Sequence, residues 1–204
     1  MVRFIKPVLF AACLLPLALL FWNGLHDHLT ANPIAEITHQ TGDWTLRFIL
    51  MTLSITPLRR LTGWSEIIRV RRMLGLFAFF YGTLHFSTYL VLDQFFAFDE
   101  IVKDIRKRPF ITVGFTSFVL LIPLALTSSA AMIRRMGGRR WQQLHRLIYL
   151  TAIGGVVHYW WLVKADVRRP QAYAAVVMLL LGYRVVTHLT RRGLTADRHR
   201  LVRP

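Results

Sequence analysis

The segment RRWQQLHRLIYLTAIGGVVHYWWL, residues 139–162, decides the fold because it places two histidines in an apolar run of membrane-spanning length. His145 and His158 are thirteen residues apart. On one continuous helix they would lie ~20 Å apart along the axis and within roughly 60° of one face. Such a helix can hold two haems, one near each membrane surface. Taken alone, each histidine is equally well explained as a packed or interfacial side chain.

The composition is that of a membrane protein. Hydrophobic residues make up 54% of the 204 residues, too large a share for a soluble domain of this size. The net charge of +16 comes from arginines between and after the apolar runs. This pattern is typical of loops held on the cytoplasmic side, and it argues against a nucleic-acid-binding surface. The single cysteine, Cys13, excludes a disulfide framework and a thiol-based metal site.

The sequence contains no glycine-rich nucleotide-binding motif and no soluble stretch long enough for a nucleotide domain. Any nucleotide-linked reductant must therefore act through another protein.

Six apolar runs predict an all-α membrane protein, a bundle of six transmembrane helices that forms a single domain over residues 1–204. The runs cover residues 7–25, 44–58, 73–92, 110–127, 144–163 and 171–189. The loops after the second and fourth runs and the C-terminal tail are rich in arginine, whereas residues 26–43 contain no lysine or arginine. Both termini are therefore predicted to be cytoplasmic.

The first run is also compatible with a cleaved signal peptide, but it lacks a clear cleavage site. We expect a retained helix with a kink at Pro16. The segment 93–109 is expected to be an external loop whose aromatic residues lie at the membrane interface.

The third run contains one histidine, His85. If the third and fifth runs both begin inside, His85 lies ~18 Å from Met73 and His158 ~21 Å from Leu144 along parallel helices. The matched depths predict that both imidazoles bind one cofactor. Two neutral imidazoles can fill both axial positions of a haem iron, which leaves a one-electron centre without an open site. Glycines on the two helices either leave room for a flat macrocycle or allow close packing; they are Gly75, Gly82, Gly154 and Gly155.

The site around His145 is less complete. At its depth the third helix has Arg71 and Arg72 in place of a second histidine. Arginine is an unusual iron ligand but a natural partner for a propionate or a phosphate. Arg47 and Arg184 each either snorkel to the interface or contact a propionate within the bundle.

Two segments are typical of a known family: RRMLGLFAFFYGTLHFSTYL, residues 71–90, and RRWQQLHRLIYL, residues 139–150, with His158 beyond. They resemble the MsrQ (YedZ) family, the membrane haem subunits of bacterial periplasmic methionine sulfoxide reductase systems, within the ferric reductase-like transmembrane proteins. The string W-x-x-L-H-x-L-x-Y, residues 141–149, is the most specific part. The resemblance places the family's haem histidines on His85, His145 and His158. Larger members of the group carry two histidines on each helix, and this chain departs from that pattern at Arg71.

The resemblance implies a multi-pass b-type cytochrome of the bacterial inner membrane, with one or two haems b and FMN. Such a subunit would pass electrons from the quinone pool or a cytoplasmic flavin reductase to a periplasmic molybdopterin enzyme that repairs oxidised methionines. The substrate chemistry would then take place on the partner.

Two other functions are open at this point. One is a stand-alone transmembrane reductase of ferric or cupric ions, although the chain lacks the fused flavin and nicotinamide domains that such reductases usually carry. The other is a haem-free transporter or structural membrane protein, in which the histidines relay protons or pack. Absorbance separates the last from the redox functions, because a bis-imidazole haem gives a sharp Soret band.

Overall fold

A computed structural model describes residues 2–201, and the side chains of residues 5–190 within that range. Every regular element of this part of the chain is helical, which confirms the all-α prediction. The elements in order are α1 (Val2–Leu25), α2 (Pro33–Thr62), the 3-10 helix η1 (Ser65–Val70), α3 (Arg71–Ser87), the π-helix η2 (Thr88–Asp93), α4 (Phe98–Lys107), α5 (Pro109–Leu126), α6 (Ala130–Met136), α7 (Gly138–His145), α8 (Leu147–Leu162) and α9 (Arg168–Leu201).

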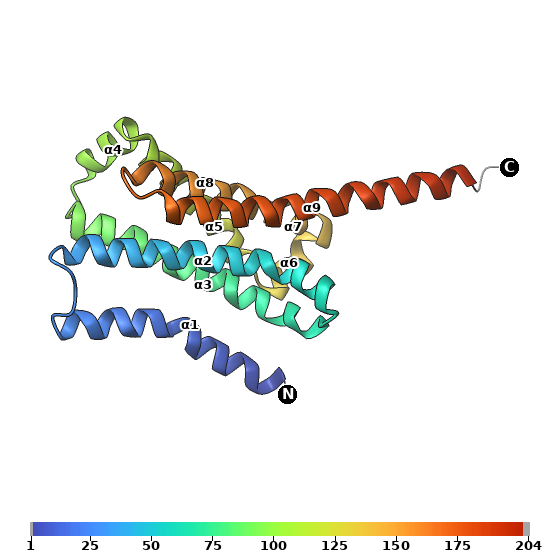
Figure 1. Cartoon of the computed structure of the whole chain (residues 1–204), viewed down its shortest axis with the longest axis horizontal. Coiled ribbons are helices and arrows are strands. Elements are labelled where there is room, and N and C mark those ends of the chain that lie inside the picture. Colours follow the sequence, from blue (N-terminus) through green and yellow to red (C-terminus); the bar gives the residue numbers. More distant parts are fainter. Residues whose placement is uncertain (1, 202–204) are drawn as a thin grey trace.

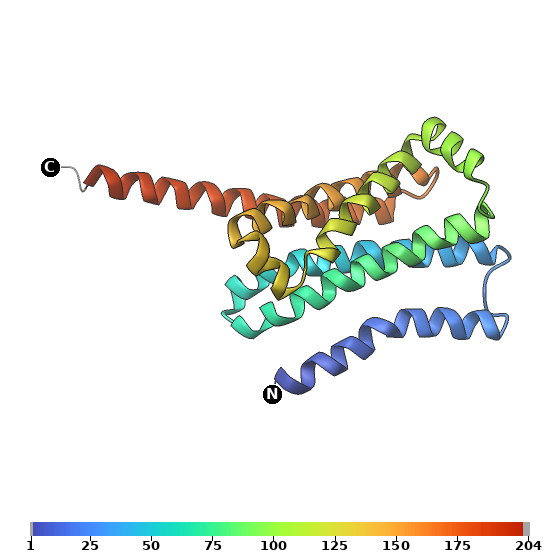
Figure 2. The ribbon, with the colours of Figure 1, turned by 180° about the vertical axis from the view of Figure 1, so that it is seen from behind.

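The long helices run roughly along one axis (Figures 1 and 2). The short helix α4 lies at one end of the bundle and α6 and α7 lie at the other, and we call these the α4 end and the α6 end. Helix α2 is central, because it packs against α1, α3, α8 and α9, while α5 packs against α3 and α8. The four helices α2, α3, α5 and α8 therefore surround the middle of the bundle.

Each of the six predicted runs is largely helical, and four helical segments of the described residues are long and apolar enough to cross a membrane. These segments are Ile5–Leu25, Ser65–Asp93, Pro109–Leu126 and Arg168–Thr190. The other two predicted runs fall in α2, which has polar residues along its length, and in α8, which has 16 residues. Thr41 and Thr52 of α2 are both buried against neighbouring helices. A central helix tolerates such side chains because its neighbours shield them from lipid.

The start of α2 differs from the prediction. The helix begins at Pro33 rather than at residue 44, so much of the expected external loop is helical. The Asn32 side chain accepts a hydrogen bond from the Ala35 amide at 3.1 Å, Pro33 occupies the first helical position, and Glu36 lies in the first turn. All three features favour a helix N-terminus. The added turns place Thr38 and Gly42 against His85 of α3.

The predicted run 144–163 is not one helix, and neither is the longer segment 139–162, because the helix is interrupted at Arg146. The Arg146 amide bonds to the Gln143 carbonyl at 3.2 Å, and the Tyr149 amide bonds to the Arg146 carbonyl at 3.0 Å. These three-residue steps form a tight turn of 3-10 type. His145 therefore ends α7, whereas His158 belongs to α8. The segment 93–109 was expected to be a loop, but it contains the helix α4.

The kink predicted in α1 is present (Figure 1). Pro16 lies at this position, and the buried Tyr81 of α3 bonds beside it. The Tyr81 hydroxyl donates to the Cys13 carbonyl at 2.9 Å and accepts from the Leu17 amide at 3.1 Å. In a regular helix these two backbone groups would bond to each other. The kink thus has two physical causes, a missing N–H and an inserted hydroxyl.

Candidate functional site

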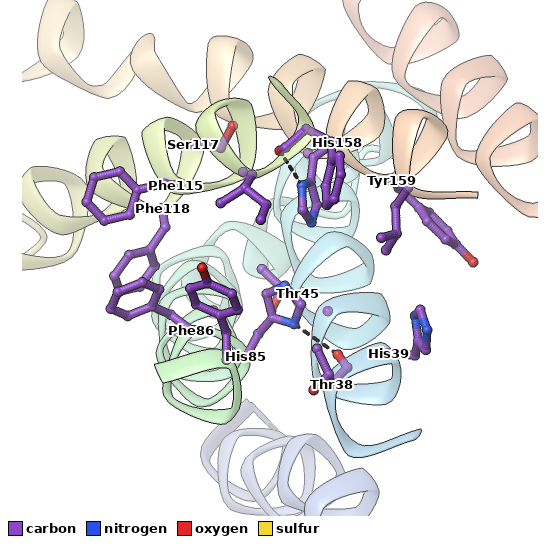
Figure 3. A pocket seen from close by; sticks show the side chains of 18 of the residues that line it. Thr38, His39, Thr45, His85, Phe86, Phe115, Ser117, Phe118, His158 and Tyr159 are labelled. Atoms are coloured by element: carbon purple, nitrogen blue, oxygen red, sulfur yellow. Dashed lines mark hydrogen bonds between the residues drawn. The ribbon is translucent and has the colours of Figure 1, made fainter. Parts of the chain in front are cut away.

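His85 and His158 meet in the middle of the bundle. Their ring centres are 6.0 Å apart, and their ring planes are inclined by 75°. Figure 3 shows the two imidazoles facing each other from α3 and α8. Both line a cavity of about 570 Å³, a volume within the usual range for ligand pockets. The structure therefore brings together the two histidines that were predicted to lie at one depth.

Backbone carbonyl groups set the tautomer of both rings. Nδ1 of His85 lies 2.9 Å from the Thr38 carbonyl oxygen, and Nδ1 of His158 lies 2.7 Å from the Phe110 carbonyl oxygen. A carbonyl oxygen can only accept, so each Nδ1 carries the hydrogen and donates it. In the neutral ring Nε2 then keeps its lone pair and is available as a ligand. A carbonyl that orients a histidine in this way is typical of metal-binding imidazoles.

A glycine on a neighbouring helix packs against each imidazole. A Cβ at Gly114 of α5 would lie 2.6 Å from Nδ1 of His158, and one at Gly42 of α2 would lie 3.0 Å from Cε1 of His85. The contact at Gly114 is too short for any side chain, whereas the contact at Gly42 is tight and would need a shift of the His85 ring by a few tenths of an ångström. Neither glycine was singled out from the sequence, because each lies on a different helix from its histidine.

The four glycines that were expected either to leave room for a macrocycle or to allow close helix packing divide into two pairs. Gly82 and Gly155 line the cavity, whereas Gly75 faces Thr52 and Gly154 faces the Ser117 hydroxyl.

The cavity is apolar inside and polar at its rim. Its inner wall includes Leu46, Ile49, Phe86, Phe118 and Leu121, and its polar rim includes Asn32, His39, Asp43, Tyr89, Asp93 and Arg108. A second cavity of about 510 Å³ adjoins the rim and shares residues of α2 and α8 with it. Such a shape suits a flat apolar ligand with charged groups at one edge.

Glu36 lies beside this second cavity. The Thr30 amide donates to its carboxylate at 2.6 Å and the Gln40 side chain at 3.0 Å, and these bonds hold the pKa of Glu36 below its ordinary value.

Arg47 does not point into the cavity. Its Nε donates to the Tyr173 hydroxyl at 3.1 Å, its Nη2 lies 3.4 Å from an Asp43 oxygen, and its guanidinium lies over the Trp44 ring. Asp43 also pairs with Arg169 at 3.6 Å. The Arg47 side chain is therefore engaged with other groups of the bundle, and each of the two roles considered for it stays a prediction.

The remaining predicted residues lie towards the α6 end. His145 stacks on Trp141 with ring centres 3.8 Å apart, and its Nδ1 lies 3.1 Å from the Trp141 carbonyl oxygen. Arg184 donates to the Leu53 carbonyl at 2.8 Å and lies over the Tyr149 ring.

The arginines at the start of α3 share this end of the bundle. Arg71 is half-buried and close enough to His145 and Arg184 to interact electrostatically with both, whereas Arg72 is exposed. The structure thus groups His145 with Arg71 and Arg184, away from the cavity that holds His85 and His158.

Residues 9–156 match the family described as ferric reductase like transmembrane component. The chain is 57% identical over 183 residues to a protein of Herminiimonas arsenicoxydans, a match that covers 89% of this chain and 84% of the relative. It is 56% identical over 191 residues to a protein of Azospira oryzae (93% and 82% covered) and 50% identical over 199 residues to one of Xanthomonas euvesicatoria pv. vesicatoria (95% and 91% covered). Each relative is named as the heme-binding subunit MsrQ of a protein-methionine-sulfoxide reductase.

The chain belongs to the MsrQ family. This membership confirms the resemblance seen in the sequence motifs, and together with the apolar helices it indicates a multi-pass membrane protein. No solved structure matches the chain at a significant level.

The cavity of this MsrQ-family chain fits a haem by the chemistry of its ligands. Metal–imidazole bonds are about 2.0–2.1 Å long, so an iron shared by two imidazoles separates their ring centres by about 6.3 Å. The observed separation is 6.0 Å. Among the side chains of residues 5–190, no group of three or more His, Cys, Asp or Glu residues is arranged to hold a metal ion. Two imidazoles alone suit an iron whose other ligands come from a macrocycle.

Proposed function

We propose that this chain is a b-type cytochrome, the membrane subunit of a methionine sulfoxide reductase system. It passes electrons across the bacterial inner membrane, from the quinone pool or a cytoplasmic flavin reductase, to a periplasmic molybdopterin enzyme. That partner carries out the repair of oxidised methionines. The names of the relatives and the membership of the ferric reductase-like family support this function.

One observation carries the proposal. His85 and His158 face each other at 6.0 Å, and each ring donates its Nδ1 hydrogen to a backbone carbonyl. When bound between two such imidazoles, a haem b supplies a one-electron centre with no open coordination position.

The chain's own residues do four things at this site. Thr38 and Phe110 hold the tautomer of the two histidines through their carbonyl oxygens. Gly42 and Gly114 leave the space that the rings occupy. The apolar wall, which includes Phe86 and Phe118, excludes water from the ligands. The polar rim faces the side from which a partner approaches.

We further propose six membrane spans, close to residues 7–25, 44–58, 73–92, 110–127, 144–163 and 171–189, in one domain over residues 1–204. The α6 end is rich in arginine. Its arginines include the pairs Arg59–Arg60, Arg71–Arg72, Arg134–Arg135 and Arg139–Arg140. The positive-inside rule then places this end and both termini in the cytoplasm and the α4 end in the periplasm. All five arginines of the C-terminal tail lie beyond the residues whose side chains are described.

The cluster at the α6 end is the entry point for electrons in this proposal. His145 supplies an imidazole, which lies against the backbone of Trp141 and of Leu124. Arg71, Arg72 and Arg184 supply positive charge for an anionic group, which is a propionate of a second haem or the phosphate of FMN. Arg71 stands at the position of a second histidine, where its guanidinium would hold a propionate or a phosphate rather than an iron.

The test uses membrane vesicles that contain the chain, with the purified periplasmic partner added. Reduced quinone, or a flavin reductase with its nicotinamide substrate, serves as the electron donor, and conversion of methionine sulfoxide is measured. We expect His85→Ala and His158→Ala to abolish conversion. His28→Ala should leave it intact, because His28 is exposed and does not line the cavity.

Three results would contradict the proposal. A colourless wild-type protein would exclude both redox functions. Unchanged conversion of methionine sulfoxide in His85→Ala would contradict the proposed role of the cavity in electron transfer. Rapid reduction of ferric or cupric ions without the partner, in place of conversion with it, would favour the stand-alone reductase.

A further inference from the structure

Arg108 is the one arginine or lysine that lines the cavity of His85 and His158 in the described part of the chain. It lies at the corner between α4 and α5, in an extended conformation directly before Pro109. Its side chain is 56% exposed, so the guanidinium is at the rim rather than inside the apolar wall. In the sequence it is one of four basic residues in the segment 93–109, and nothing distinguishes it from Arg106 or Lys107.

Two neighbouring groups orient the Arg108 side chain. Nε of Arg108 lies 3.2 Å from Oδ1 of Asp104, whose carboxylate is mostly buried. The hydroxyl of Tyr89, which also lines the cavity, donates to Oδ2 of Asp104 at 3.4 Å. A guanidinium has five N–H donors in a fixed fork. Because the ion pair with Asp104 occupies Nε, donors remain at the rim for a second anion.

The same corner also positions an iron ligand. Phe110, two residues after Arg108, is the residue whose carbonyl accepts from Nδ1 of His158. The position of the cation and that of the imidazole are therefore coupled through three consecutive residues.

The acidic side chains of the rim, Asp43 and Asp93, have partners other than Arg108. Asp43 pairs with Arg47 at 3.4 Å and with Arg169 at 3.6 Å. Asp93 accepts from the Gln94 side chain at 2.9 Å. Arg108 is thus the basic side chain of the rim that has N–H donors left for a carboxylate.

We propose that Arg108 binds a propionate carboxylate of the haem held by His85 and His158, and that the Arg108–Asp104 pair sets the reduction potential of that haem. This inference rests on the proposed function. A positive charge close to the haem favours the reduced state, which carries one more electron, whereas a negative charge favours the oxidised state. Loss of Arg108 should therefore lower the midpoint potential, and loss of the Asp104 charge should raise it.

The experiment is a spectroscopic redox titration of the purified haem-loaded protein. Arg108→Gln is compared with Arg106→Gln, a matched change of charge two residues away at a residue that does not line the cavity. We expect Arg108→Gln to shift the equilibrium towards the oxidised haem about tenfold, which is ~59 mV for a one-electron couple. Arg106→Gln should shift it much less, and Arg108→Lys should retain part of the wild-type potential because it keeps the charge but not the fork.

Asp104→Asn distinguishes an electrostatic role from a structural one. We expect it to shift the potential upwards, opposite in sign to Arg108→Gln, and it reports on the pair even if Arg108→Gln loses its haem. Equal potentials for Arg108→Gln and Arg106→Gln would overturn the assignment of Arg108, as would downward shifts in both Arg108→Gln and Asp104→Asn. A wild-type protein without haem would instead overturn the proposed function, so the two failures are separable.

Discussion

Replacing Gly114 by alanine tests the site more sharply than removing a histidine, because the change adds one methyl group and leaves both ligands in the chain. That methyl would lie 2.6 Å from Nδ1, 2.8 Å from Cε1 and 3.0 Å from Cγ of His158. Ordinary contacts begin near 3.4 Å. The imidazole must therefore move by roughly 0.8 Å, which exceeds the ~0.5 Å tolerance of a preorganised site. The 2.7 Å bond from His158 to the Phe110 carbonyl is then lost or distorted.

Two effects on stability oppose each other in Gly114→Ala. Alanine is favoured over glycine within a helix by roughly 0.5–1 kcal/mol. Overpacking a tight contact typically costs about 1–3 kcal/mol. We expect net destabilisation together with loss of most of the low-spin haem signal, measured as haem per protein after purification. Far-ultraviolet circular dichroism checks that the helices have formed.

Two other glycines provide a graded series. In Gly42→Ala the methyl would lie 3.0 Å from Cε1 and 3.1 Å from Nδ1 of His85, so a shift of roughly 0.4 Å suffices and haem binding should weaken without disappearing. A Cβ at Gly182 would meet no atom within 4 Å, so Gly182→Ala should keep all of its haem and melt slightly higher. Full haem occupancy with an unchanged spectrum in Gly114→Ala would refute the placement of His158.

Three further changes test other parts of the structure. Tyr81→Phe removes the hydroxyl that bonds to Cys13 and Leu17; it should lower the free energy of unfolding by about 1–3 kcal/mol and spare the haem, and an unchanged melting temperature would argue against the hydroxyl's role in the kink. Asn32→Ala removes the N-cap of α2, with an expected cost of about 1 kcal/mol in thermal unfolding; Asn23→Ala, outside the cap, should cost less. Arg47→Gln should leave the haem content unchanged because Arg47 contacts Asp43 and Tyr173. Loss of the signal of the haem bound by His85 and His158 would instead support a contact between Arg47 and a propionate.

The pairing of His85 with His158 was predictable because helix rise and membrane depth fix how far each residue lies along a span. The sequence motifs also predicted the family correctly. The groups that hold the two rings were not predictable. The acceptors at Thr38 and Phe110 are backbone carbonyl groups, which any residue type provides. Gly42 and Gly114 matter only because a histidine of another helix packs against each of them.

Local signals were also overlooked. Asp43 precedes Arg47 by four residues, the spacing of an ion pair on a helix, and this pair predicts a partner for Arg47 within its own helix. Asn32-Pro33 followed by Glu36 is a helix start, which would have extended α2 to its true length. The break at Arg146 has no comparable signal, since neither glycine nor proline lies within that turn.

The central claim is that His85 and His158 bind the same haem while His145 serves a different site. It is tested most directly by reduced-minus-oxidised spectra and haem quantitation on the detergent-purified protein, with wild type beside His85→Ala, His158→Ala and His145→Ala. We predict that the first two variants lose one and the same haem signal and that His145→Ala keeps it. Retention of that signal in His85→Ala or His158→Ala, or its loss in His145→Ala with the fold intact, would contradict the account.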